Sequence, residues 1–239
     1  MRDILSIPFH EECCSLIIAS DNSGAIGAKK DDHIHVPYET VAYYSFRVAV
    51  MECIAAGGIP VSVVIHNFCG NKVWNELVIG VQKGLLELGF NEVSITGSTE
   101  SNFSLVQSAV GLIVVGKKPF GTTRELTYSE RLKFAVVGMP LVGNEVIEHE
   151  NKVVPLPVFQ EISRLKDVVI WPVGSKGILH EMNQMFTERK FTKESLITVL
   201  DVLKSSGPAT CFITIYQDKD EEKIRKLTNN YFYPLQIDR

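Results

Sequence analysis

The sequence predicts a mixed α/β (α+β) fold, and two observations support this prediction. Short apolar, β-branched runs alternate with longer amphipathic segments, and glycine or proline separates most of them. This alternation is typical of proteins that pack helices against a sheet. The chain has 239 residues, of which 45% are hydrophobic, so it is long enough to bury a sizeable core. The order of the strands in a sheet does not follow from the pattern.

The first half of the chain alternates strands and helices. A short buried strand is expected at 14–20, and a helix at 39–56 carries apolar residues on more than one face. Gly57 and Gly58 end that helix, and Pro60 blocks its continuation. The other expected elements are a strand at 61–66, a helix at 71–88, and strands at 91–96 and 105–115.

A polar, turn-rich stretch at 117–124 indicates a domain boundary. We therefore predict two domains, 1–120 and 121–239. The second half is expected to hold strands at 134–137, 167–171 and 211–216, and helices at 176–187, 193–205 and 219–228.

Composition excludes several classes of protein. The formal charge of −4 is spread along the chain, which argues against non-specific binding of nucleic acid. The five cysteines are an odd number and form no C-x-x-C pair, so neither a disulfide framework nor a zinc site is indicated. No apolar stretch approaches the roughly 20 residues that span a bilayer. Without a signal peptide at its start, the sequence is expected to be cytoplasmic and reduced.

Glu52 is the only formally charged residue between Arg47 and Lys72. An ionised carboxylate in apolar surroundings is costly to bury unless a metal ion, a cationic side chain or hydrogen-bond donors meet it. Glu52 is therefore a candidate site residue. The alternatives are a salt bridge, for example with Arg47, or a helix end that reaches water.

Two further carboxylates follow predicted strands. Asp21 comes directly after the strand at 14–20, and Glu100 follows the strand at 91–96, both in loops rich in glycine, serine and asparagine. Ligands tend to gather at strand ends in sheets that are fed by helices. Asp21, Glu52 and Glu100 are thus a plausible cage for Mg²⁺, although each loop alone is an ordinary turn.

The segments around these carboxylates resemble a family. Residues 21–27 (DNSGAIG), 52–60 (ECIAAGGIP) and 96–100 (TGSTE) match, in order and spacing, the motifs of the PurM-like ATP-binding superfamily. That superfamily includes aminoimidazole ribonucleotide synthetase, selenophosphate synthetase and thiamine-monophosphate kinase. Residues 21–27 together with 95–103 (ITGSTESNF) are most similar to its small alpha-ribazole kinase group. Glu52 stands where the family has Asp, and Ser98 where it has a metal-binding acid, a role that Glu100 could take over.

The resemblance implies a fold and partners. The N-terminal half would form a β-barrel together with a second chain, as a homodimer that binds ATP near its interface, and the C-terminal half would be a shortened α/β domain. It also implies Mg²⁺ as cofactor and ATP as co-substrate. Asp21 and Glu52 are then the residues expected to be essential for catalysis, through the metal.

The chain has no Gly-x-x-x-x-Gly-Lys-Ser/Thr loop, so its glycine-containing loops are the candidates for phosphate binding. Turn chemistry and helix capping are the alternatives for these residues. The candidate ATP or phosphate contacts are Asn22, Ser23, Gly24, Gly27, Gly97, Ser98, Thr99 and Lys176, and the candidate substrate contacts are His33, His35 and Asn102.

These expectations lead to one hypothesis and two alternatives. The hypothesis is a kinase that transfers the γ-phosphoryl group of ATP to the 5′-hydroxyl of alpha-ribazole, for assembly of the lower ligand of cobalamin. The first alternative is another ATP-using enzyme of the superfamily, either a thiamine-phosphate kinase or a synthetase that forms an amide phosphate. The second is a nucleotide-binding module without catalysis.

Overall fold

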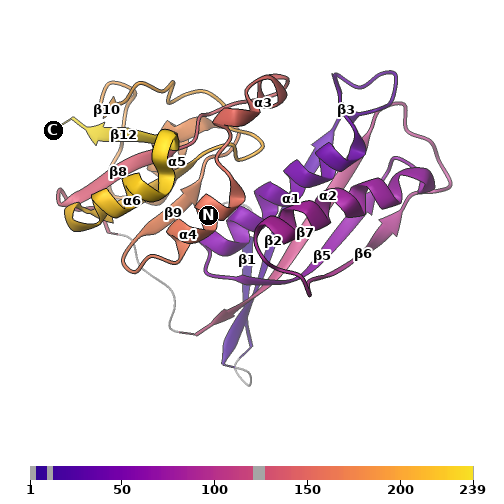
Figure 1. Ribbon diagram of the computed structural model, residues 1–239, viewed down its shortest axis with the longest axis horizontal. Coiled ribbons are helices and arrows are strands. Elements are labelled where there is room, and N and C mark those ends of the chain that lie inside the picture. Colours follow the sequence, from indigo (N-terminus) through magenta and orange to yellow (C-terminus); the bar gives the residue numbers. More distant parts are fainter. Residues whose placement is uncertain (1–3, 10–12, 121–126, 239) are drawn as a thin grey trace. The chain divides into compact units, whose positions relative to one another are not determined.

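The chain forms two compact units, one made of residues 2–123 and the other essentially of residues 124–239. Figure 1 shows this computed structural model, which describes residues 4–9, 13–120 and 127–238. The division falls close to residues 121–126, which lie outside the described ones. Each unit has its own five-stranded sheet.

The first unit is built on a sheet with the strand order β1-β2-β7-β5-β6. Neighbouring strands are antiparallel except for β5 and β6, which are parallel, so their carboxyl ends lie at the same edge. The sheet is open, and the described strands of the single chain form no closed barrel. The bounds are β1 Ile4–Phe9, β2 Cys14–Gly24, β5 Ile59–Asn67, β6 Ser94–Thr99 and β7 Ala109–Pro119.

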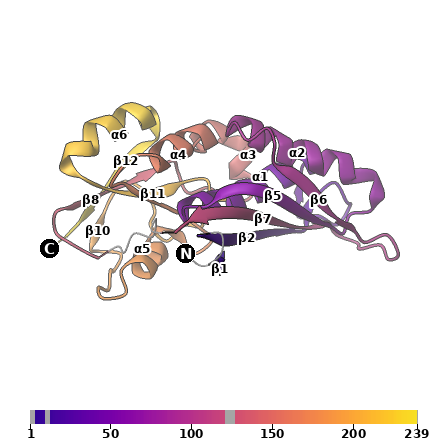
Figure 2. The same ribbon diagram turned by 90° about the horizontal axis from the view of Figure 1, so that it is seen from below.

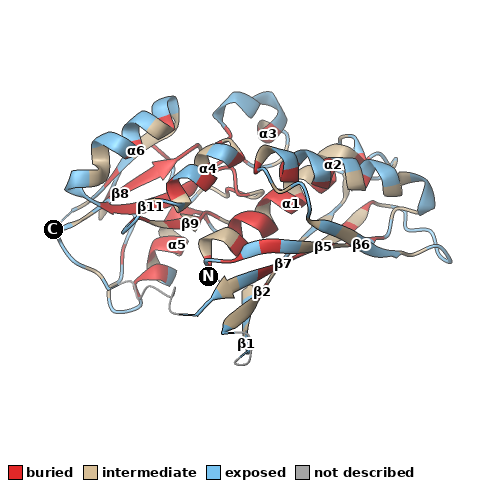
Figure 3. Ribbon diagram, turned by 60° about the horizontal axis from the view of Figure 1, so that its bottom comes forward, coloured by how far each residue is buried: buried red, intermediate tan, exposed pale blue. Residues whose placement is uncertain are grey.

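Two helices lie on one side of this sheet (Figure 2). The helix α1, Tyr38–Ala55, packs on the sheet and is buried along most of its length, as Figure 3 shows. The helix α2, Trp74–Glu87, packs on α1 with an apolar stripe through Leu77, Val81 and Leu85. The expected helix at 39–56 is thus confirmed, and its apolar residues on several faces match its burial between the sheet and α2.

Short elements complete the first unit. The two-residue strands β3, Ile26–Gly27, and β4, Ile34–His35, pair in parallel between β2 and α1. A 3₁₀ turn, η1, Asn71–Val73, leads into α2.

Three predicted strand boundaries are wrong in the first unit. β2 does not stop before Asp21 but continues to Gly24, since residues 21–24 pair with 109–112 of β7. β6 is shifted from 91–96 to 94–99, and β7 begins at Ala109 rather than near residue 105. Ladder hydrogen bonds to neighbouring strands outweigh the local turn preference of Asp, Asn, Ser and Gly here.

The second unit has an antiparallel sheet with the order β10-β12-β8-β11-β9. Figure 2 shows α4 and α6 on one side of this sheet and α5 on the other. The strands are β8 Leu132–Val137, β9 Val169–Pro172, β10 Leu196–Ile197, β11 Phe212–Gln217 and β12 Phe232–Ile237. The helices are α3 Glu145–Glu148, α4 Leu156–Ser163, α5 Gly177–Met185 and α6 Glu221–Thr228, with 3₁₀ turns η2 Glu150–Lys152, η3 Asp218–Asp220 and η4 Asn229–Tyr231.

The predicted helix at 193–205 is wrong, because this segment is a loop with one short strand, β10. Its apolar residues Leu196, Leu200 and Val202 are buried in the core of the second unit without a helical backbone. β10 pairs with β12, a strand that the sequence pattern did not predict. Asn183 also holds the start of the loop, where it exchanges two hydrogen bonds with the backbone of Phe191.

Candidate functional site

Polar residues gather at one edge of the sheet of the first unit, where β2, β5 and β6 end and β7 begins. Asn67, a residue with 1% of its surface exposed, links the carboxyl ends of β5 and β6 by hydrogen bonds. Its side-chain amide donates to Thr99 Oγ1 at 3.0 Å, and its backbone carbonyl accepts the Glu100 N–H at 2.8 Å. Because ligands bind preferentially beyond the carboxyl ends of parallel strands, this edge is the candidate site.

A buried carboxylate ties two loops together at this edge. Asp32 is 6% exposed and accepts the Ser108 N–H on Oδ1 at 2.7 Å and the Ser108 hydroxyl on Oδ2 at 2.7 Å. The Lys29 N–H donates to Oδ2 at 2.8 Å, and the Tyr38 hydroxyl lies 2.9 Å from Ser108 Oγ. This group, Lys29, Asp32, Tyr38 and Ser108, is called the Asp32 network below. It joins the segment after β2 to the segment before β7.

The ammonium group of Lys29 extends the network to a third loop. It donates to the carbonyl oxygens of Leu105 at 2.8 Å, Gln107 at 3.2 Å and Phe68 at 3.5 Å. Gln107 in turn donates to the Asp31 carbonyl at 2.7 Å. The loops after β2, after β5 and before β7 are therefore cross-linked into one edge.

The hydrogen bonds of the network favour an ionised Asp32. Burial by itself disfavours the charge, but the donors from Ser108 and Lys29 outweigh it and lower the pKa of Asp32. Burial raises the pKa of the Tyr38 hydroxyl. Asp32 is thus charged and Tyr38 neutral at physiological pH.

The three predicted metal ligands are spread over the unit. Asp21 pairs with Leu112 of β7, whereas Cys53, next to Glu52, packs against Gly116. Leu112 and Gly116 are four residues apart on β7, which corresponds to about 13 Å along the strand. Glu100 follows β6, three strands from β2, which corresponds to roughly 14 Å across the sheet.

Among the described residues, no three His, Cys, Asp or Glu side chains form a group that could hold a metal ion. One chain therefore does not gather Asp21, Glu52 and Glu100 into a single cage. Glu52 is buried as expected, at 5% exposed. Glu100 accepts the N–H groups of Asn102 at 2.6 Å and Phe103 at 3.1 Å on Oε1, so it closes its own turn.

Arg47, the alternative salt-bridge partner of Glu52, is fully buried on α1. Burial lowers its pKa, while Tyr43, Tyr44 and Glu87 favour its charge. Cys53 is buried, and its pKa is raised to about 12 by burial, which fits core filling rather than reactivity.

The predicted phosphate contacts divide between the two faces of the sheet. Asn22, Gly24 and Ser98 are exposed on the face away from the helices, called the open face below. Ser23 and Thr99 alternate with them and lie on the side of α1.

Two of the predicted glycines have packing reasons. A Cβ on Gly97 would lie 2.0 Å from the Ile65 carbonyl oxygen and 2.8 Å from the Trp74 ring. A Cβ on Gly27 would lie 2.5 Å from Ser108 Oγ and 2.9 Å from the Tyr38 ring. Close packing thus accounts for both glycines without a ligand.

The other predicted residues are dispersed. Lys176 is exposed in the second unit, directly before α5, which begins at Gly177. His33 and His35 are exposed on the segment between β2 and α1, and Asn102 is exposed in the turn after β6. Lys29, Asp32 and Ser108 were not predicted as site residues. A buried aspartate within a polar stretch leaves no local signal, because its partner lies 76 residues away.

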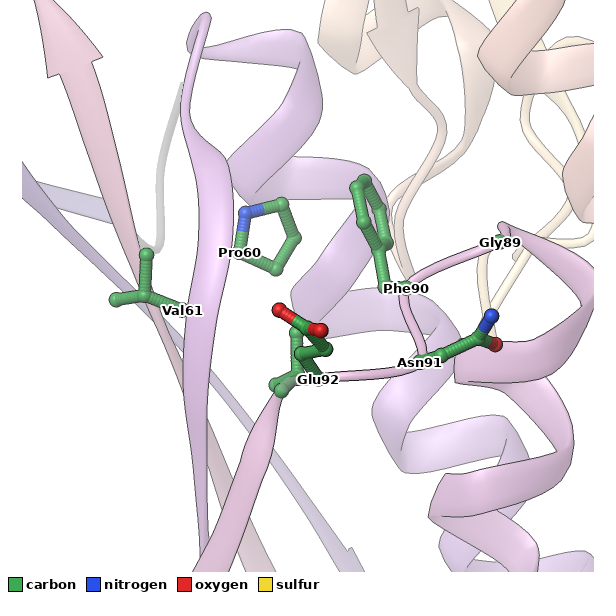
Figure 4. A pocket seen from close by; sticks show the side chains of 7 residues that line it. Pro60, Val61, Gly89, Phe90, Asn91 and Glu92 are labelled. Carbon is green, nitrogen blue, oxygen red and sulfur yellow. The ribbon is translucent and has the colours of Figure 1, made fainter.

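A pocket of about 510 Å³ lies at the opposite edge of the sheet, beside the start of β5. Figure 4 shows Pro60 and Phe90 on either side of it, with the carboxylate of Glu92 between them. Its lining residues are Pro60, Val61, Gly89, Phe90, Asn91, Glu92 and Val93. None of these is a predicted site residue.

None of the described helices has both the length and the apolar character that crossing a membrane requires.

No protein-family model matches the sequence, and no curated protein matches it significantly. Solved structures do match.

A thiamine monophosphate kinase from Aquifex aeolicus matches with a TM-score of 0.63 and 13% identity, over 100% of this chain and 89% of that one. PurL of T. maritima, in complex with ATP, matches with a TM-score of 0.62 and 12% identity, over 97% of this chain. This chain spans only 41% of that PurL chain. A HypE–HypF complex matches with a TM-score of 0.58 and 13% identity, over 93% and 85% of the two chains. The chain therefore has the PurM-like fold of these structures.

Proposed function

We propose that this protein is an ATP-dependent kinase for a small nucleoside-like acceptor, and that its acceptor is alpha-ribazole, phosphorylated on the 5′-hydroxyl. The observation that carries the proposal is a match to a kinase along the whole chain. The same A. aeolicus kinase in complex with AMPPCP and TMP covers 98% of this chain, with a TM-score of 0.60 and 11% identity. A fold alone does not fix a reaction, so the polar edge of the sheet must supply the chemistry.

Phosphoryl transfer requires mainly positioning and cancellation of charge. Backbone N–H groups and short polar side chains at the ends of β2 and β6, from Asn22, Gly24 and Ser98, are suited to phosphate oxygens. The Asp32 network supports this role, because it fixes the loops at the same edge. Lys176 remains a proposed phosphate contact from the second unit.

We propose that Mg²⁺ binds together with ATP. The described residues of one chain do not form a metal cage, so no step is derived through the ion. When bound, it would neutralise charge on the triphosphate. Asp21, Glu52 and Glu100 remain proposed ligands, and substitution of Asp21 and Glu52 tests the first two.

We also propose a homodimer. No described helix of the first unit lies over the open face, and alternate residues there are apolar, among them Ile18, Val64, Ile113 and Val115. A second copy would cover the apolar part of this surface, away from Asn22 and Ser98, and would protect the sheet edges formed by β1 and β6. Light scattering should give twice the chain mass of 26.7 kDa. A monomer at micromolar concentration would refute this part of the proposal.

The test of the function is incubation with magnesium-ATP and alpha-ribazole, followed by mass detection of a monophosphate and of ADP. Thiamine phosphate, selenide and formylglycinamidine ribonucleotide are the parallel acceptors. Product from alpha-ribazole alone supports the proposal. Product from another acceptor would instead assign that acceptor as the substrate of this protein.

The second candidate is a nucleotide-binding module without catalysis. The observation that favours it is the absence of a gathered metal cage among the described residues. Magnesium-dependent binding of ATP, measured by calorimetry, without turnover on any acceptor would establish it.

A further inference from the structure

A histidine that the sequence pattern did not single out lies on the open face near the candidate site. His66 is the last residue but one of β5, and it is exposed. Across the sheet it pairs with Gly111 of β7 on one side and with Ser98 of β6 on the other. Gly111 pairs in turn with Asn22 of β2. These four residues form one row across four strands, called the polar row below.

The middle of the polar row is a notch. Gly111 has no side chain, and a Cβ there would lie 3.4 Å from His66 Cβ and 3.8 Å from His66 Cδ2. The imidazole thus borders the empty position. Asn22 and His66 stand on either side of Gly111, about 10 Å apart by the usual spacing of strands. The position between the Asn22 amide and the His66 imidazole thus carries no side chain of its own.

The cross-strand neighbours of His66 carry no charge, and Glu100, two residues beyond Ser98, accepts the backbone N–H groups of Asn102 and Phe103. The cross-strand neighbours on β7 and β6 are Gly111 and Ser98, and the next residues on the same face are Ala109, Ile113 and Thr96. None of these is ionisable. His33 and His35, in contrast, lie on the segment that the Asp32 network holds.

We propose that the His66 imidazole orients the acceptor hydroxyl in the notch over Gly111 and takes up its proton. This proposal rests on the proposed kinase function, in which Asn22 and Ser98 hold the phosphates at the two ends of the same row. The acceptor oxygen forms a bond to the γ-phosphorus, and the bond from that phosphorus to the β,γ-bridging oxygen breaks. ADP leaves with the bond's electron pair, and the hydroxyl proton passes to an imidazole nitrogen and then to water.

The test is the kinetics of His66→Ala and His66→Gln in the full chain, with magnesium-ATP and the acceptor that the wild type phosphorylates. Because a positioned base contributes roughly 10²- to 10⁴-fold, kcat should fall by about 100-fold or more in His66→Ala. The KM for ATP should stay unchanged, and added imidazole should restore part of kcat. A purely structural histidine would not give rescue by imidazole.

Gly111→Ala is the matched probe of the notch, since it fills the space without removing a functional group. It should raise the KM for the acceptor and leave ATP binding, measured by calorimetry, unchanged. Ser62→Ala is the control on the same strand and face. Ser62 Oγ donates only to the Ser94 carbonyl, at 3.3 Å, and its substitution should not change kcat.

The outcomes separate the two proposals. Unchanged kcat in His66→Ala, in a wild type that is active, overturns this inference and leaves the kinase intact. Loss of kcat in His33→Gln or His35→Gln, with full activity in His66→Gln, also overturns it. A wild-type protein that phosphorylates no acceptor overturns both. Light scattering on each variant excludes loss of assembly as the cause.

Discussion

The two faces of the sheet in the first unit differ in how tightly their side chains are packed. On the face under α1, side chains such as Ile17, Val63 and Leu112 are almost fully buried, and glycines allow close approaches. On the open face, alternate residues of the same strands are exposed or half-buried, and Asn22 and His66 lie there on either side of Gly111. The covered face therefore determines stability, and the open face with its polar edge is available for chemistry.

The largest expected effect concerns the two carboxylates predicted as metal ligands, Asp21 and Glu52. If they bind the magnesium of ATP, Asp21→Asn and Glu52→Gln should each reduce ATP turnover by about 100-fold or more, since a lost metal ligand removes several kcal/mol of charge stabilisation. Turnover is measured by coupled detection of ADP. Urea unfolding should show a retained fold, and full turnover in both variants would end their role as ligands.

The second effect compares two glycines of β7. A Cβ on Gly116 would lie 2.5 Å from Cys53 Sγ under α1, whereas one on Gly111 would meet His66 at 3.4 Å on the open face. Gly116→Ala should lower the free energy of unfolding by about 1–3 kcal/mol through overpacking. Gly111→Ala should change it by less than about 0.5 kcal/mol. Equal losses of unfolding free energy in Gly116→Ala and Gly111→Ala, measured by urea unfolding, would refute the difference in packing between the two faces.

The third effect is the pH dependence contributed by Asp32. Its pKa in the folded protein is lowered from the ordinary value of 3.8, so its stabilising contribution is complete above that value and is lost as pH falls through the lower, folded pKa. At pH 7, Asp32→Asn should cost about 1–3 kcal/mol, because Ser108 and Lys29 lose a charged acceptor.

The measurement is urea unfolding of both proteins between pH 7 and pH 3. The advantage of the wild type over Asp32→Asn should begin to decline below about pH 3.8. A difference between the two proteins that stays constant down to pH 3 would contradict the assigned ionisation of Asp32.

The smallest effect is expected at the far end of the open face. Ser62→Ala removes one long hydrogen bond to the Ser94 carbonyl and should change the free energy of unfolding by less than about 0.5 kcal/mol. A loss above 1 kcal/mol in thermal or urea unfolding would show that the open face is more tightly packed than its exposure indicates.

The sequence predicted those parts of the fold that local pattern determines. The α1 helix follows from its apolar residues and from Gly57 and Pro60 at its end. The extension of β2 through Gly24 could not be predicted, because it depends on pairing with β7, about 90 residues away. The loop at 193–205 has apolar content suited to a helix, but its pairing with β12 and its burial decide otherwise.

The candidate site was predicted only in part. The polar ends of β2 and β6 were found, because Asn, Ser and Gly after apolar runs are a local signal. The Asp32 network and the polar row depend on strand register, which periodicity does not give. His66 in particular lies in a strand whose alternation can be read, but its neighbours Asn22 and Gly111 come from other strands.

The most direct test of the account is a crystal structure with magnesium and a non-hydrolysable ATP analogue. The account predicts that the phosphate oxygens lie within hydrogen-bonding distance of Asn22 and Ser98, near the carboxyl ends of β2 and β6. A nucleotide bound in the pocket beside Pro60 and Phe90, at the opposite edge of the sheet, with the polar row unoccupied, would contradict it.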